Sequence, residues 1–313
     1  MSPPHQPLDS ASAKPAVADS VPPPPVVSDR ELEQGRHSPG ASSKLSWLWR
    51  PSSRGRFYRA RVSLLLAILA FVLLWAGTDC YQRRARTAWS RPLKVALVLV
   101  EREPVATSTI GLFGDRAHAL ERRLASEYER HNGRHFTPFS FDLKGPLLAE
   151  QAPPSVEPGA LGLLRYSYAL WRWTRELDAR AGVERGDYDA RIYLVMKPAS
   201  PGRVAFVEGE GEYGGRIGVA QADIEPGMID FSLFVAAHEL MHTLGASDKY
   251  DDSGNALYPD GFAEPEKTPL YPQPGAEIMA RDLPLTATSA RPPGSLDELF
   301  VGNATATEIG WRK

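Results

Sequence analysis

Between Phe231 and Asp248 the chain reads FSLFVAAHELMHTLGASD, and this is the most informative stretch of its 313 residues. Apolar residues fill most positions from 231 to 244, and a helix that is apolar almost all round is typical of the interior of a domain. Three ionisable side chains, His238, Glu239 and His242, interrupt this pattern. We therefore expect a helix at the centre of a domain that carries chemically active groups.

Two histidines four residues apart lie one above the other on one face of a helix, so His238 and His242 can bind the same ion. This spacing is typical of zinc ligands, whose nitrogens lie about 2.0–2.1 Å from the metal. Glu239 follows about 100° further around the helix, where it can contact a water on the metal without binding the metal. The sequence therefore predicts Zn2+ as cofactor and Glu239 as the catalytic general base.

The residues after His242 predict how the site is completed. Gly245 can adopt the left-handed conformation that ends a helix, so the chain turns back there. Asp248 can then supply a third ligand and leave the fourth position to water. The competitors for this role are acidic residues further along the chain: Asp251, Asp252, Asp260 and Glu298.

In this run the sequence resembles the metzincin metallopeptidases, specifically the members that have Asp rather than His as third ligand. The resemblance covers roughly residues 204–280. It implies zinc-dependent hydrolysis of peptide bonds, with a protein or peptide as substrate. It also implies an α/β fold in which a twisted, mixed and mostly parallel sheet lies beside a backing helix and a central active-site helix.

Metzincins also carry a Met-turn, in which a methionine lies beneath the metal on a tight turn. Met279, in the run from Pro274 to Ala280, fits this role, and ordinary core packing is the alternative. Some metzincins place a tyrosine two residues later, where it stabilises the transition-state oxyanion, but this chain has Arg281 there. The candidates to replace that tyrosine are Tyr250, Tyr258 and Tyr271, and zinc alone is the other possibility.

Upstream segments independently favour an α/β domain over residues 92–313. Runs of branched apolar residues predict buried strands, and apolar residues at helical spacing predict two helices. The strands are expected at Leu93–Val100 and Ala190–Met196, with a weaker one at Phe136–Leu143, and the helices at Asp115–His131 and about Gly159–Ala181. Alternating strands and helices predict a largely parallel sheet.

A glycine-rich run, residues 208–215, breaks this alternation and predicts a flexible hairpin or an edge strand. We expect a peptide substrate to lie along a sheet edge formed near Arg216 to Gln221, because extended peptides add to exposed edges. His131 and His135 are also four residues apart, but Asn132 and Gly133 between them end a helix, so a shared metal site is not expected there.

The residues from Val62 to Gly77 include neither charge nor proline and predict a membrane-spanning helix. With its aromatic flanks it extends over residues 57–81, and it is expected to be an uncleaved signal anchor because roughly sixty residues precede it. Arginines flank both ends, and the positive-inside rule leans towards a cytoplasmic N-terminus. The expected location is a bacterial-type inner membrane, with the catalytic domain on the periplasmic side.

The remaining features set limits. Residues 1–56, rich in proline, serine and alanine, predict a disordered tail. A net charge of -2 without a basic stripe argues against a nucleic-acid partner. Cys80 is the single cysteine, so an intrachain disulfide is excluded.

Three functions fit these observations. The first is a membrane-tethered zinc metallopeptidase acting on extracytoplasmic proteins or peptides. The second is a catalytically silent, membrane-bound interaction protein with a structural zinc site, although such a site has no use for the base Glu239. The third is hydrolysis of an amide that is not a peptide bond.

Overall fold

The computed structural model describes residues 53–156, 158–199, 207–211 and 214–312, and the statements below concern these residues. Most of the predicted tail, up to residue 52, lies outside the described residues. The same holds for 204–206 and 212–213, which belong to the predicted hairpin region.

A five-stranded sheet forms the centre of the domain, with strand order β2-β1-β3-β5-β4. Its strands are β1 (Leu93–Glu101), β2 (Phe139–Leu148), β3 (Ala190–Pro198), β4 (Val207–Gly211) and β5 (Ile217–Ile224). The strands pair in parallel except for β4, which is antiparallel to β5. The predicted α/β class with a mostly parallel sheet is confirmed.

The predicted edge near Arg216 to Gln221 is wrong. This segment lies in and next to β5, which is internal, because β4 pairs along it with Gly209 opposite Ala220. The glycine-rich run, predicted as a flexible hairpin or an edge strand, supplies β4, which is the strand at the end of the sheet.

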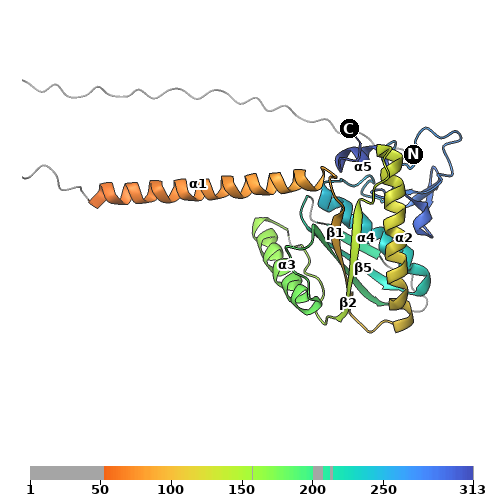
Figure 1. Ribbon diagram of the computed structural model, residues 1–313, viewed down its shortest axis with the longest axis horizontal. Coiled ribbons are helices and arrows are strands. Elements are labelled where there is room, and N and C mark those ends of the chain that lie inside the picture. Colours follow the sequence, from red (N-terminus) through yellow and green to blue (C-terminus); the bar gives the residue numbers. More distant parts are fainter. Residues whose placement is uncertain (1–52, 157, 200–206, 212–213, 313) are drawn as a thin grey trace, which may run out of the picture. The chain divides into compact units, whose positions relative to one another are not determined.

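Helices cover both faces of the sheet (Figure 1). The helices α2 (Thr107–Asn132) and α4 (Ile229–Leu244) pack on one face, and α3 (Ala160–Ala181) packs on the other. Successive side chains of β1 point to opposite faces, so Leu97 meets the first layer and Val98 the second. Because both faces are buried, β1 reads as a continuous apolar run.

The backing helix α2 ends as the sequence predicts but begins earlier. Gly133 takes the left-handed conformation, with φ of 68°, directly after Asn132. The helix begins at Thr107 rather than Asp115 because Thr109 and Phe113 are buried and prolong its core-facing side.

The part of the domain after α4 has little regular structure. Its short elements are β6 (Ala276–Glu277), β7 (Leu283–Thr286), β8 (Ser289–Arg291), β9 (Leu299–Phe300), α5 (Asn303–Glu308) and the 3-10 turn η2 (Leu296–Glu298), and a further turn, η1 (Pro226–Met228), precedes α4. The chain returns to the core at Trp311, whose ring packs on Trp89, Tyr128 and Phe139. Trp89 donates a hydrogen bond to the Ile309 carbonyl at 2.8 Å, so residues just before 92 belong to this core.

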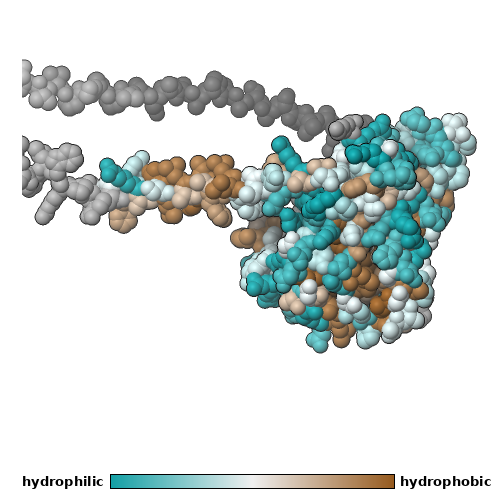
Figure 2. Space-filling view, viewed as in Figure 1, coloured by the Kyte–Doolittle hydropathy of each residue, from teal (hydrophilic) through white to brown (hydrophobic). Residues whose placement is uncertain are grey.

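One long helix, α1 (Ser53–Arg86), precedes the domain. Its stretch from Phe57 to Arg86 is long and apolar enough to cross a membrane, with a mean hydropathy of 2.2 in its most apolar window and none of that window buried. Figure 2 shows the apolar side chains exposed along this helix. Length and composition therefore agree with the predicted span.

Candidate metal centre

The helix α4 brings the two histidines together in the interior of the domain. The Nε2 atoms of His238 and His242 lie 3.1 Å apart, and their rings meet edge to face at 87°. His238 is only 8% exposed because α4 packs against the sheet and against α2.

Backbone carbonyls fix the proton on each imidazole. Nδ1 of His238 donates to the Ile278 carbonyl at 2.8 Å, and Nδ1 of His242 donates to the Ala246 carbonyl at 2.9 Å. Because a carbonyl oxygen can only accept, each Nδ1 holds a proton, so Nε2 is the nitrogen of each ring that can bind a metal. Carbonyl partners of this kind orient metal-binding histidines.

Asp248 approaches the same point from the loop after α4. Gly245, with φ of 100°, ends the helix, and the chain reverses there. The Asp248 Oδ1 atom then lies 3.3 Å from His238 Nε2 and 3.2 Å from His242 Nε2. Tetrahedral ligands about 2.0–2.1 Å from zinc are about 3.3–3.4 Å from one another. The triangle of donor atoms therefore has the size of one face of a zinc tetrahedron, and the residues fit the metal.

The competing side chains have partners elsewhere. Asp251 accepts hydrogen bonds from two backbone amides of its own loop, and Glu298 pairs with Arg291 at 2.6 Å. His131 contacts the Val301 carbonyl, whereas His135 pairs with Glu129. Two further competitors are exposed: Asp252 and Asp260. Of the acidic residues considered as third ligand, Asp248 is the one that the structure brings to both histidines.

The charged groups of this site shift one another's pKa. Burial acts to raise the pKa of Asp248, but its hydrogen bonds to His238 and His242 outweigh burial and hold that pKa well below the usual range. Burial acts to lower the pKa of His242, but the hydrogen bond that its ring donates to Asp248 and the charge of Glu239 raise it overall. A site that favours positive charge in this way suits a divalent cation.

Glu239 is almost fully buried, at 1% exposure, and its Oε1 atom lies 3.9 Å from His238 Nε2. Two glycines make room for it. A Cβ at Gly209 in β4 would lie 1.8 Å from Glu239 Oε1, and one at Gly218 in β5 would lie 2.9 Å from Glu239 Cβ. The glycine-rich run therefore has a packing role at the site that sequence reasoning missed.

The run around Met279 forms a turn that contacts the site. Met279 is fully buried, and the Ala280 amide donates to the Glu277 carbonyl at 2.9 Å across the turn. On one side of Met279 is Ile278, whose carbonyl holds His238. The Met279 carbonyl accepts from the Lys249 amide at 2.8 Å, next to Asp248. The turn therefore links the segments that carry two of the three donor groups.

Glu277 is a further buried group that sequence reasoning missed. Its carboxylate accepts hydrogen bonds from the Met279 amide at 2.6 Å, the Gly302 amide at 3.0 Å and the Thr305 hydroxyl at 2.7 Å. Burial outweighs these bonds and raises the pKa of Glu277 to about 7. An acidic residue just before a buried turn is the signal that could have identified it.

Of the three candidate tyrosines, Tyr250 lies at the site. Its ring stacks on His238 with centroids 6.4 Å apart. Burial, the charge of Asp248 and a hydrogen bond with it raise the pKa of Tyr250 to about 12. Tyr258 and Tyr271 instead both pack on the ring of Phe262.

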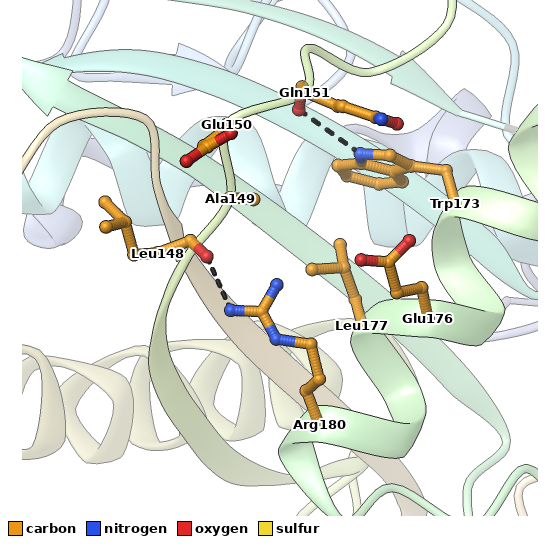
Figure 3. Close-up of a pocket in the computed structure, with 8 residues that line it drawn as sticks. All are labelled: Leu148, Ala149, Glu150, Gln151, Trp173, Glu176, Leu177 and Arg180. Carbon is orange, nitrogen blue, oxygen red and sulfur yellow. Dashed lines mark hydrogen bonds between the residues drawn. The ribbon is translucent and has the colours of Figure 1, made fainter.

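A separate pocket of ≈ 270 Å³ lies between the end of β2 and α3 (Figure 3). Across it, Arg180 donates to the Leu148 carbonyl at 2.5 Å and Trp173 donates to the Gln151 carbonyl at 3.4 Å. It lies on the α3 face of the sheet, opposite α4, so it does not form part of the metal centre.

Comparisons with known proteins add little to this geometry. No protein-family model matches the chain, and no curated protein matches it in sequence. Among solved structures, it is similar to the crystal structure of archaemetzincin from Methanopyrus kandleri. The two are 17% identical with a TM-score of 0.31, over 63% of this chain and 90% of that one.

Proposed function

We propose that this protein is a zinc-dependent metallopeptidase of the metzincin type, in which His238, His242 and Asp248 bind zinc and Glu239 is the general base. The observation that carries the proposal is the triangle of three donor atoms, 3.1 to 3.3 Å apart, with both Nδ1 protons held by carbonyls. Three protein ligands leave a fourth position open, which is typical of catalytic rather than structural zinc sites.

The residues divide the chemistry between them. When bound, zinc supplies Lewis-acid chemistry, lowering the pKa of a water and polarising the scissile carbonyl. Glu239 accepts the proton of the attacking water and passes it to the leaving amine. Its burial beneath Gly209 and Gly218 keeps bulk water from its carboxylate, so the proton is directed to the substrate. For the developing oxyanion we propose Tyr250 as hydrogen-bond donor, because its ring lies beside His238.

A peptide is the substrate that the sheet favours. β4 is the last strand of the sheet, and it passes directly over Glu239. An extended peptide that pairs with β4 adds one more strand, and its carbonyls then run past the metal centre. This pairing selects for an unfolded segment of a protein or for a free peptide.

The proposed enzyme is tethered to a membrane by α1. Its apolar stretch is long enough to span a bilayer. We propose an inner-membrane location with residues 92–313 on the periplasmic side, as the weak arginine asymmetry of the sequence suggests.

Metal content and cleavage of the full-length chain in detergent test the function together. We expect one zinc per chain, fragments from a peptide library, and a Glu239→Gln variant that keeps its zinc while turnover falls by about 10²–10⁴-fold. Glu298→Gln is the matched control, because this glutamate is bound to Arg291 away from the site. Zinc binding without cleavage by the wild type would favour the silent module, and loss of zinc in Glu239→Gln would contradict the role of that residue.

A further inference from the structure

The segment that carries Asp248 has no secondary structure to hold it. Residues 246–249 follow the end of α4 and belong to neither helix nor strand, and the Asp248 side chain is 42% exposed. A loop side chain of this kind loses conformational freedom when it binds a metal. Contacts with other parts of the domain must therefore hold Asp248 beside the two histidines.

One carboxylate contacts both neighbours of Asp248. Glu308, the last residue of α5, accepts a hydrogen bond from the Ser247 amide at 3.0 Å and another from the Ser247 hydroxyl at 2.8 Å. The ammonium group of Lys249 donates to the two Glu308 oxygens at 2.8 and 2.9 Å. Glu308 therefore holds the chain on each side of the proposed third ligand.

Lys249 completes this cluster, which we call the Glu308 clamp (Ser247, Lys249 and Glu308). Its Nζ also donates to the Ser247 hydroxyl at 2.6 Å and to the Ser247 carbonyl at 3.0 Å. The Lys249 side chain is only 6% exposed, and a buried ammonium group needs a carboxylate partner. The Lys249 amide is bound to the Met279 carbonyl, so the clamp also meets the Met-turn.

The C-terminal segment fixes Glu308 in turn. Ile309 and Trp311, which follow it closely, are buried in the main core at 0% and 1% exposure. The Ile309 carbonyl accepts from Trp89, and the Trp311 ring packs among three other aromatic rings. The packed core thus holds the Glu308 carboxylate against residues 246–249, and contacts of this kind keep the ligands of a metal site in place.

We infer that Glu308 is a positioning residue for the zinc site, holding Asp248 in place through Ser247 and Lys249. This inference rests on the proposed zinc site, and it adds that Glu308, at the end of α5, increases the affinity of that site for zinc. Outer partners that orient metal ligands typically change metal affinity by about 10-fold to 100-fold when they are mutated.

The test compares Glu308→Gln with Glu298→Gln in the full-length chain. The first substitution keeps the size of the side chain, but the new amide nitrogen cannot accept a hydrogen bond from Lys249 or Ser247. We expect zinc affinity, measured by competition with a chelator, to fall about 10-fold to 100-fold, with an altered absorption spectrum of bound Co2+. Glu298→Gln breaks a comparable pair, that with Arg291, and should leave both readouts unchanged.

The outcomes separate the clamp from the function. If the wild type binds zinc and Glu308→Gln binds it equally tightly with the same Co2+ spectrum, the clamp is refuted and the proposed function stands. If the wild type binds no zinc, both are refuted. Should Glu308→Gln fail to fold, Ser247→Ala decides, because it removes only the hydroxyl bonded to Glu308. A loss of zinc affinity smaller than that expected for Glu308→Gln supports the clamp, and wild-type affinity refutes it.

Discussion

The Asp248→Ala substitution tests whether Asp248 is the third zinc ligand of the proposed site. The substitution removes the Oδ1 atom that lies 3.3 and 3.2 Å from the histidine nitrogens. The two imidazoles keep their orientation, because their Nδ1 bonds go to Ile278 and Ala246 and do not involve Asp248. What is lost is therefore one ligand rather than the whole site.

The size of the loss follows from the number of ligands. Zinc binding by four-ligand structural sites is worth about 10–16 kcal/mol, so one ligand contributes about 3–4 kcal/mol. This corresponds to a fall in zinc affinity of about 100-fold to 1,000-fold. The Asp248 side chain is 42% exposed, so its truncation leaves no core cavity. The metal-free chain loses its hydrogen bonds to the two histidines, and its unfolding free energy should fall by about 1–3 kcal/mol.

Chelator competition measures the affinity, and chemical denaturation of the metal-free protein measures the stability. Glu298→Ala is the control, because Glu298 is the other acidic residue considered as a ligand and its partner is Arg291. It should keep zinc affinity and turnover near those of the wild type. If Asp248→Ala retains tight zinc and turnover, the assignment of the third ligand and the metzincin type fail, although His238, Glu239 and His242 would still mark a zinc hydrolase.

Three further predictions concern the turn, the pH dependence and the membrane. Met279→Leu keeps the volume of a buried side chain, so it should lower the unfolding free energy by under about 1.5 kcal/mol and largely retain activity. A variant that is folded but inactive in the cleavage assay would show that the turn does more than pack. Burial raises the pKa of Glu277 from 4.5 to about 7, so its contribution to stability is complete below about pH 4.5 and is lost as the pH rises through about 7, by about 3 kcal/mol in all. Thermal denaturation across this range should show that loss in the wild type and not in Glu277→Gln, and equal slopes would exclude Glu277 as its source. A reporter that works only outside the cytoplasm should be active when fused after Lys313, and cytoplasmic reporter activity would reverse the proposed orientation while leaving the chemistry intact.

The sequence by itself determined the features that depend on local patterns. The spacing of His238 and His242 on an apolar helix places both imidazoles on one face whatever surrounds them. Gly133 and Gly245 mark helix ends because glycine takes the left-handed conformation without strain, and both adopt it here. The continuous apolar sequences of β1 and β3 predicted buried strands, because a parallel sheet is covered by helices on both faces.

Only the tertiary structure decided which distant groups meet. The sequence favoured Asp248 as third ligand over four other acidic residues, but only the folded chain shows its Oδ1 atom 3.3 and 3.2 Å from the two histidine nitrogens. Nothing in the pattern around His238 indicated that its proton is held by Ile278, which lies 40 positions further along the chain. In the same way, Glu308 reaches Lys249 across 59 positions.

The edge of the sheet was misplaced for a related reason. The run 208–215 was predicted as a hairpin or an edge strand, but its pairing with β5 and the packing of Glu239 against Gly209 are visible only in the folded domain. Periodicity reports which face of an element is buried, because burial repeats with the helix or strand. It does not report which partner covers that face, since partners are chosen by packing between segments that are far apart in the chain.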